Sequence, residues 1–352
     1  MRIGLIAPPW VPVPPPAYGG TEAVLDALAQ GLQSAGHDVL MVCHPDSTCP
    51  VPKASVIPVE DTVRMGRMII ELEHAIGAYD LVRDVDVVHD HTLAGPVYSS
   101  RFPELVVVTT NHNPFSRPYN ALYHSVVPRV GVVAISQSHA DSTDVPIDAV
   151  VHHGIDVDDY PFGAGDGGYV ALLGRMAPNK GVHRAIAVAR AVGTPLKIAA
   201  KMREPHEVQY FEEFVEPHLG GDIEYLGEVD ADGKRDLLAS AAALLNPISW
   251  REPFGMAMLE ALACGTPVVG CPQGAAPEIV EHAVTGYLGD SDAELINGLQ
   301  SLDRIDRNVC RDHARTRFSV ERMVEGYSNV YERRLEMAAT AQRSPQHRVA
   351  LA

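Results

Sequence analysis

The chain has 352 residues, 46% of them hydrophobic, which is enough apolar material for two packed domain cores. Its 45 acidic and 28 basic side chains give a formal net charge of −17, which argues against a nucleic-acid partner and against an anionic membrane. No apolar run reaches the roughly 18 residues that cross a bilayer, and Met1 leads straight into an expected strand rather than a signal peptide. We therefore expect a cytoplasmic protein. The composition does not determine its oligomeric state.

Short apolar runs alternate with helical patterns from end to end, which is typical of parallel sheets covered by helices on both faces. In the first half of the chain we expect strands at 2–7, 38–43, 55–59, 85–89, 105–109, 130–135 and 149–151, with an amphipathic helix at 62–83. In the second half we expect strands at 169–173, 196–200, 223–226, 243–245, 267–270 and 286–288. Each half is therefore predicted to be a doubly wound α/β unit.

The glycine-rich segment 160–168 has no apolar period, so we place the boundary between two domains there. The first domain is predicted at 1–160 and the second at 167–318. A helical pattern follows at 319–335, and the polar residues 339–352 are expected to form a flexible tail. Two such domains in tandem leave a cleft between their carboxyl-end loops, where ligands of open α/β sheets bind.

A proline-rich loop follows the first expected strand and ends at Gly19 and Gly20, just before a helix. Glycines at a helix start allow backbone amides to approach a ligand closely. The GxGxxG spacing of a dinucleotide site is absent. The alternative is a stiff loop with a glycine turn and no ligand. We favour a contact with a phosphate or with an acceptor.

His112 follows the strand expected at 105–109 and is predicted to lie on a loop at the cleft. A lone histidine is more often a structural hydrogen-bonding group than a catalyst, so both roles stay open. The pairs His89/His91 and His152/His153 could suggest a metal. Two ligands at close spacing without a third make a poor zinc or iron site, so no metal is expected.

Two cations, Arg175 and Lys180, follow Gly174 where the strand at 169–173 gives way to a helix. The arginine offers a planar fork to a diphosphate and the lysine a point charge, so together they can neutralise a leaving group. The Gly-Lys-Ser/Thr of a Walker loop is absent. The alternative is a pair of solvated surface charges. Lys201, just after the next strand, is a third candidate cation.

Glu252 and Glu260 are the most informative pair of residues in the chain. Pro253 suits the first position of a helix and Gly265 the far end, which predicts a helix at 254–264 opened by Glu252. The free amides of its first turn form an anion site beside a carboxylate that can bind sugar hydroxyls. Glu260 lies six residues after the start of this helix, about 9 Å along the axis at 1.5 Å per residue, so one helix can hold both ends of a nucleotide sugar. The alternative is a solvated amphipathic helix with two incidental carboxylates.

With these motifs the chain resembles the retaining family-four glycosyltransferases of GT-B fold over nearly its whole length. The matching runs of the second half come in the family's order: 172–175 with 180–181, 226–229, 252–255 with 260–261, 264–269, 277–280 and 285–286. The runs 18–22, 200–201 and 250–255 are similar to those of a bacterial subgroup described as UDP-glucose:tetrahydrobiopterin glucosyltransferase-like.

The resemblance implies two Rossmann-like domains facing across a cleft, with a C-terminal helix at 319–338 crossing back onto the first domain. It implies that the reaction is carried by His112, Arg175, Lys180 and Glu252, with no metal and no cofactor. The donor-binding residues that it implies are Gly19, Gly20, Gly174, Arg175, Lys180, Lys201, Glu228, Val229, Glu252, Phe254, Gly255, Met256 and Glu260. Among these, Glu260 would bind the ribose, and the chain around Glu228 and Val229 would read the base.

The chain departs from the family at two places. His153-Gly154 stands where the family commonly has Asn-Gly, which can alter the hinge or the acceptor pocket, and 199–202 replaces a glycine-rich turn. The expected function is transfer of a hexose, glucose above all, from a UDP-linked donor to a small soluble acceptor with retention. The alternatives are a nucleotide-sugar epimerase, a pyridoxal-phosphate phosphorylase and a sugar-nucleotide binding protein that does not transfer.

Overall fold

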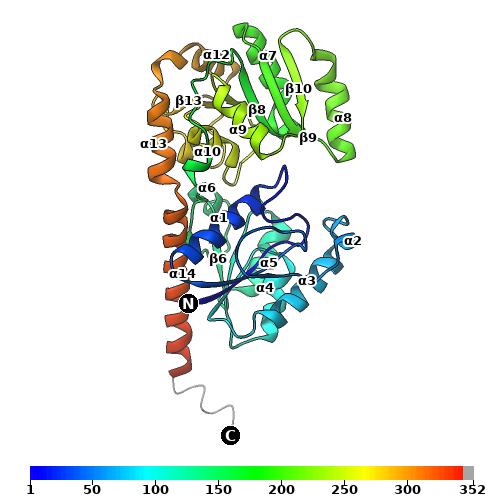
Figure 1. Ribbon diagram of the computed structural model, residues 1–352, viewed down its shortest axis with the longest axis vertical. Coiled ribbons are helices and arrows are strands. Elements are labelled where there is room, and N and C mark those ends of the chain that lie inside the picture. The colour runs from blue at the N-terminus through cyan, green and yellow to red at the C-terminus, as the bar shows by residue number, and fades with distance from the viewer. Residues whose placement is uncertain (344–352) are drawn as a thin grey trace.

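The computed structural model describes residues 1–343, folded as two α/β domains stacked along the long axis of the molecule (Figure 1). The first domain holds a seven-stranded sheet in the order β3-β2-β1-β4-β5-β6-β7, and the second a six-stranded sheet in the order β10-β9-β8-β11-β12-β13. The pairings of the named strands are parallel throughout. The predicted fold class, two Rossmann-like sheets in tandem, is confirmed.

The elements of the first domain run as follows: β1 Arg2–Ile6, α1 Gly20–Ser34, β2 Asp38–Val42, β3 Lys53–Ala54, α2 Val59–Thr62, α3 Met68–Leu81, β4 Val87–Asp90, α4 Ala94–Tyr98, β5 Val106–Thr110, α5 Arg117–Val126, β6 Val130–Ala134, α6 Gln137–Ala140 and β7 Ala149–Val150. Those that follow are β8 Val170–Arg175, α7 Val182–Val192, β9 Leu196–Lys201, α8 Pro205–Phe214, β10 Ile223–Gly227, α9 Ala231–Ser240, β11 Leu244–Asn246, α10 Met256–Ala263, β12 Val268–Gly270, α11 Ala276–Ile279, β13 Gly286–Leu288, α12 Asp292–Gln300, α13 Arg307–Arg317 and α14 Val320–Arg343.

Two expectations for the first domain are wrong. The strand expected at 55–59 is the short β3 at Lys53–Ala54, because Pro58 has no N–H for a ladder and instead precedes α2 as its cap. The single helix expected at 62–83 is divided into α2 and α3. Between them Gly66 has φ of 80°, a left-handed conformation that a continuing helix cannot contain.

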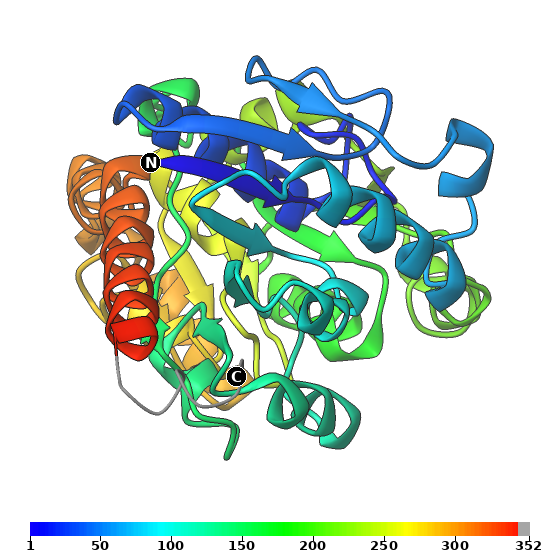
Figure 2. The same cartoon turned by 90° about the horizontal axis from the view of Figure 1, so that it is seen from below.

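The C-terminal helix α14 supplies part of the core of the first domain. Tyr327 and Tyr331 are fully buried there together with Leu5 and Leu28, from β1 and α1. Gly31 of α1 allows close packing, since a Cβ at that position would lie 2.5 Å from Val320. Both views show α14 beside the amino-terminal end of the chain (Figures 1 and 2). The helix continues to Arg343, so 339–343 of the predicted tail are helical, and 344–352 lie outside the described residues.

The chain passes between the domains twice, and the two passages pair with each other. Ile155 donates its amide hydrogen to the carbonyl oxygen of Phe318 at 3.0 Å, and Ile155 and Ser319 form a parallel bridge. Gly154 is needed for this approach, because a Cβ there would lie 2.4 Å from the Ser319 carbonyl oxygen. The paired passages act as one double connection at one side of the molecule.

The glycine-rich segment at 160–168 is fastened to the second domain. The amides of Gly163 and Gly167 donate to the carbonyl oxygens of Cys264 at 3.0 Å and of Ser240 at 2.9 Å, while Arg307 donates to Gly163 O at 2.7 Å. A Cβ on Gly163 would lie 1.9 Å from the Ala239 carbonyl oxygen. The glycines therefore serve close packing here, whereas the sequence pattern had indicated a loose linker.

Glu278 of α11 links the two domains by hydrogen bonds. Its carboxylate accepts the amide hydrogens of Gln137 at 2.8 Å and Ser138 at 2.7 Å, at the start of α6, and it pairs with His152 Nε2 at 2.8 Å. Burial raises the pKa of Glu278, but the hydrogen bonds from His152 and from the two amides outweigh it, so the pKa is lowered. The carboxylate is therefore ionised at neutral pH and holds all three donors.

We predict that Glu278→Ala lowers the free energy of unfolding by about 2 kcal/mol, because it leaves two amides and an imidazole without their charged acceptor. Urea unfolding followed by circular dichroism measures the loss. Glu104→Ala, at an exposed site of the first domain, is the matched control and is expected to change little. Equal midpoints for the two variants would show that the contact does not stabilise the molecule.

Candidate functional site

Arg175 and Lys201 end the neighbouring strands β8 and β9 and are register partners. Glu207, in the first turn of α8, lies between them with its carboxylate 3.3 Å from Lys201 Nζ and 3.9 Å from Arg175 Nη1. Burial raises the pKa of Glu207, but hydrogen bonds from the Arg203 and Glu204 amides and the charge of Lys201 outweigh it, so the pKa is lowered. Two cations thus share one buried carboxylate and leave a net positive charge at the cleft edge of the sheet.

Lys180 and Glu252 meet beside Trp250. Lys180 Nζ is bonded to Glu252 Oε2 and lies 4.9 Å from the centre of the Trp250 ring, a cation–π contact. The Trp250 indole N–H donates to the same carboxylate oxygen at 3.1 Å. Only 16% of the Lys180 side chain and 13% of the Glu252 side chain are exposed. The pair is therefore held in a fixed geometry at the wall of the cleft.

The helix after Glu252 begins later than the sequence predicted. Gly255 caps it with φ of 109°, and α10 starts at Met256, so Pro253 is not its first residue. A left-handed residue cannot belong to a right-handed helix, and a Cβ on Gly255 would lie 2.3 Å from Met258 Cε. Glu252 consequently precedes the helix by a short loop instead of opening it. The free amides of the first turn start at Met256 rather than at Phe254.

The glycine pair of the first domain faces α10 across the cleft. Gly19 caps α1 and Gly20 is its first residue. A Cβ on Gly20 would lie 3.8 Å from Met256 Cγ, so the starts of α1 and α10 meet there. A Cβ on Gly19 would lie 2.6 Å from Pro15, which explains why the proline loop ends in glycine.

Tyr18, just before this pair, reaches across to the second domain. Its amide donates to Glu228 Oε1 at 3.1 Å, and Arg203 Nε donates to the other oxygen of the same carboxylate at 3.1 Å. Burial raises the pKa of the Tyr18 phenol, while hydrogen bonding and charge from Arg175 act in the opposite direction. Tyr18 therefore touches the Arg175 end of the site as well as Glu228.

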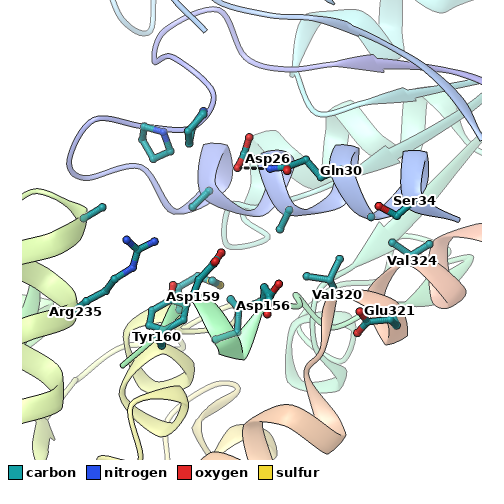
Figure 3. A pocket seen from close by; sticks show the side chains of 18 of the residues that line it. Asp26, Gln30, Ser34, Asp156, Asp159, Tyr160, Arg235, Val320, Glu321 and Val324 are labelled. Carbon is teal, nitrogen blue, oxygen red and sulfur yellow. Dashed lines mark hydrogen bonds between the residues drawn. The ribbon is translucent and has the colours of Figure 1, made fainter. Parts of the chain in front are cut away.

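Glu260 lies further along α10 and is 5% exposed. Lys234 Nζ is 2.5 Å from its carboxylate, and the Tyr160 hydroxyl donates to it at 3.4 Å. Lys234, Tyr160 and Met256 line a pocket of about 660 Å³ between α1, the segment 155–160, α9 and the start of α14. Figure 3 shows Asp26 and Gln30 on the α1 side of this pocket and Asp159 with Tyr160 on the opposite side. A pocket of this size next to Glu260 has room for a nucleoside.

His112 stands between two other histidines at the cleft end of the first sheet. Its Nε2 lies 2.9 Å from His91 Nδ1, and its ring stacks on that of His153 at 5.2 Å. His153 in turn packs edge-on against Phe254 of the second domain, with 4.9 Å between ring centres. The His153-Gly154 departure thus places an aromatic ring between His112 and the loop after Glu252.

Burial keeps these imidazoles uncharged. It lowers the pKa of His112 to about 3, helped by His139, and the pKa of His89 to about 3, helped by His112. The pKa values of His91 and His153 are also lowered well below 6.5, chiefly by burial and then by neighbouring histidines. No group of three or more His, Cys, Asp or Glu side chains within residues 1–343 is arranged to hold a metal ion.

The predicted residues thus gather in three places. The edge of the second sheet holds five of them: Gly174, Arg175, Lys180, Lys201 and Glu252. Gly174 lies next to the lysine, since a Cβ on Gly174 would be 3.8 Å from Lys180 Cδ. His112 joins Phe254 through His153, and Glu260 lies with Lys234 at the pocket. The side chain of Val229 is partly buried against an apolar cluster of the second domain. The sequence did not point to Glu207 or Lys234. Trp250 was noticed only as part of the run 250–255. His91 and His153 stood out as members of close histidine pairs, and His153 also as a departure from the family, but their contacts with His112 were not predicted.

We predict that His89 makes folding stability depend on pH. Its pKa is about 3 in the folded state and 6.5 in the unfolded state. The contribution of His89 to the free energy of unfolding is therefore complete above pH 6.5 and is lost as the pH falls. Between pH 6.5 and pH 5 the free energy of unfolding falls by about 2 kcal/mol, because each pH unit in this range costs about 1.36 kcal/mol.

The test compares urea unfolding of the natural protein and of His89→Gln at pH 7 and pH 5. The natural protein is expected to lose more stability on acidification than the variant does. Asp90, whose pKa burial raises to about 7, acts with the opposite sign, but it is present in both proteins. Parallel losses in the two proteins would remove His89 as the cause.

Comparison with known proteins identifies both domains. Residues 18–159 match the family model of Glycosyltransferase Family 4, and residues 167–302 match that of Glycosyl transferases group 1. The chain is a glycosyltransferase of GT-B fold. Within residues 1–343, none of the helices of this glycosyltransferase combines the length and the apolar character needed to cross a membrane.

Relatives along most of its length support this assignment. The glycosyltransferase is 27% identical to a phosphatidyl-myo-inositol mannosyltransferase of Mycobacterium leprae, over 87% of this chain and 88% of that one. Among solved structures it resembles AviGT4, a glycosyltransferase involved in avilamycin A biosynthesis, with a TM-score of 0.73 and 27% identity over 95% and 98% of the two chains. HepE of Anabaena, in complex with UDP and glucose, shares the fold with a TM-score of 0.74 and 19% identity over 95% and 99%.

Proposed function

We propose that this glycosyltransferase moves a glucose unit from UDP-glucose to a small soluble acceptor, with retention at the anomeric carbon and without a metal. The observation that carries the proposal is the convergence of Arg175, Lys180 and Lys201 at the carboxyl edge of the second sheet. The start of α1 meets α10 beside them. A diphosphate needs such a set of cations and free amides.

The charges at this edge favour an anion in spite of the net charge of −17. Arg175 and Lys201 share the single carboxylate of Glu207, which leaves one positive charge unmatched. Lys180 is balanced by Glu252, and a diphosphate that takes over Lys180 would free Glu252 for the hydroxyls of the sugar. One residue pair thus serves both halves of the donor.

The nucleoside would lie in the pocket beside Glu260. Lys234 and Tyr160 line the pocket and hold the Glu260 carboxylate beside it, where it could accept hydrogen bonds from a ribose diol. The UDP and glucose named for HepE support uridine and glucose as the donor parts. The runs 18–22, 200–201 and 250–255 support membership of the tetrahydrobiopterin glucosyltransferase-like subgroup.

Retention fits a front-side displacement in which the departing phosphate takes the proton of the acceptor hydroxyl. Arg175, Lys180 and the amides from Met256 onward would stabilise the negative charge that develops on that phosphate. The pKa of His112, which burial lowers to about 3, makes it a weak base. His112 would therefore contribute a hydrogen bond to the reacting sugar and not remove a proton.

We predict that Lys180→Met and Glu252→Gln each lower kcat by about 10² to 10³, the effect of losing one group that stabilises a transition state. Release of UDP from UDP-glucose in the presence of an acceptor is the measurement. Lys197→Met is the matched control, since Lys197 lies in β9 at the end away from Lys201. Near-normal turnover in either site variant, with the control unaffected, would remove that residue from the site.

A panel of UDP, GDP and ADP sugars in a thermal-shift assay identifies the donor, because a ligand at 100 times its dissociation constant adds about 2.7 kcal/mol of stability. UDP-glucose is expected to give the largest shift. UDP release that depends on the acceptor, and an α-linked product by NMR, would support transfer with retention. Binding without turnover across a broad acceptor panel, or epimerisation of the donor, would contradict it.

A further inference from the structure

A row of aromatic side chains runs from the cleft into the core of the first domain. His112 is followed by His91, whose ring lies 4.0 Å from that of His89, and His89 packs against Tyr327 at 4.7 Å. His89 is fixed at both nitrogens, by the Tyr331 hydroxyl at Nδ1 and by Thr110 at Nε2, each at 2.8 Å. The inner end of the row is therefore anchored to α14 and β5, and His91 packs against a ring that is held at both nitrogens.

The position of the proton on His91 follows from its surroundings. Its Nδ1 faces His112 Nε2 at 2.9 Å, and its Nε2 is buried with no hydrogen-bond partner among residues 1–343. A neutral imidazole has one N–H donor and one bare nitrogen. Buried N–H groups without an acceptor are rarer than buried acceptors without a donor. The proton therefore lies on Nδ1, and His91 donates to His112.

The proton position on His91 also determines which ring nitrogen of His112 carries hydrogen. Its Nε2 accepts the proton of His91, so in the neutral ring the hydrogen must be carried by Nδ1. His112 keeps part of its surface exposed, and in the described part of the chain Nδ1 takes part in no hydrogen bond. We propose that His91 is a positioning residue that fixes His112 as the Nδ1–H form, so that His112 presents a donor and not a lone pair to the cleft.

The proposal deepens the proposed function and rests on it, since it needs His112 beside the transferred sugar. In this form His112 donates a hydrogen bond to a hydroxyl oxygen of the hexose and cannot take a proton from the acceptor. His91 acts through His112 and need not touch the substrate. Its replacement should therefore lower kcat while the KM for the nucleotide sugar, which depends mainly on the diphosphate and nucleoside contacts away from His112, stays near its natural value.

The experiment compares His91→Asn with His91→Leu. The amide nitrogen of asparagine falls near the place of imidazole Nδ1, so His91→Asn keeps a donor to His112 Nε2, whereas His91→Leu has none. Two-dimensional ¹⁵N NMR of histidine-labelled protein reports which nitrogen of His112 carries hydrogen, and His112→Gln assigns the signal. Circular dichroism and the UDP-glucose thermal shift show that each variant is folded with its donor site in place.

We expect His112 as Nδ1–H in the natural protein and in His91→Asn, and a shift towards Nε2–H in His91→Leu. Turnover should fall about tenfold in His91→Leu, the loss of one hydrogen bond, and recover largely in His91→Asn. A proton on Nε2 of His112 in the natural protein would overturn the proposal. So would unchanged turnover in His91→Leu with a shifted His112. The thermal shift with UDP-glucose tests the donor site of the proposed function separately. If His91→Leu does not fold, the tautomer of the natural protein and of His91→Asn decides.

Discussion

The paired passages at Ile155 and Ser319 determine how the two sheets face each other. Both connections leave from the same side, and Glu278 adds a third attachment through α6 and His152. Because all strands are parallel, each sheet has one carboxyl edge, and the loops from those edges meet in the cleft. Ser136 after β6 donates to the Pro253 carbonyl oxygen at 2.7 Å, and Tyr18 reaches Glu228. A change in the double connection would shift every one of these contacts at once.

Electrostatics inside that cleft is local. The chain is strongly acidic, yet each cation of the site has a buried or half-buried carboxylate beside it: Glu207, Glu228, Glu252 or Glu260. Holding a lysine against a carboxylate and an indole ring costs desolvation, but it gives the charge one position instead of many. The carboxylates are also hydroxyl-binding groups, so the acidic side chains that restrain the cations suit a carbohydrate as well.

The strands and the motif residues could be predicted because their signals are local. Apart from the short β3, apolar runs predicted the strands to within a residue or two. The order of the runs around Arg175, Lys180 and Glu252 indicated the family. Two details depended on information that a local pattern does not hold. The start of α10 depends on the left-handed Gly255, and the packed segment at 160–168 depends on Ala239 and Arg307.

Partners remote in sequence were beyond prediction for the same reason. In the sequence Glu207 has the position of a helix-capping residue of α8. It can also bind Arg175 and Lys201 only because β8 and β9 lie side by side. Lys234 reaches Glu260 from another helix. His91 and His153 looked like halves of poor metal sites. In the structure both contact His112 instead, His91 through a ring nitrogen and His153 by stacking.

The burial of Tyr327 and Tyr331 in the first domain has a consequence for biosynthesis. The first domain is translated before the helix that completes its core, and about 180 residues separate the end of β7 from those tyrosines. At 5 to 20 residues per second the ribosome takes roughly 9 to 36 s to cover that distance. Until then the nascent domain exposes the apolar surface of α1 and its sheet that α14 will cover. Release of the finished chain, rather than emergence of the first half, is the moment at which this half can reach its final packing.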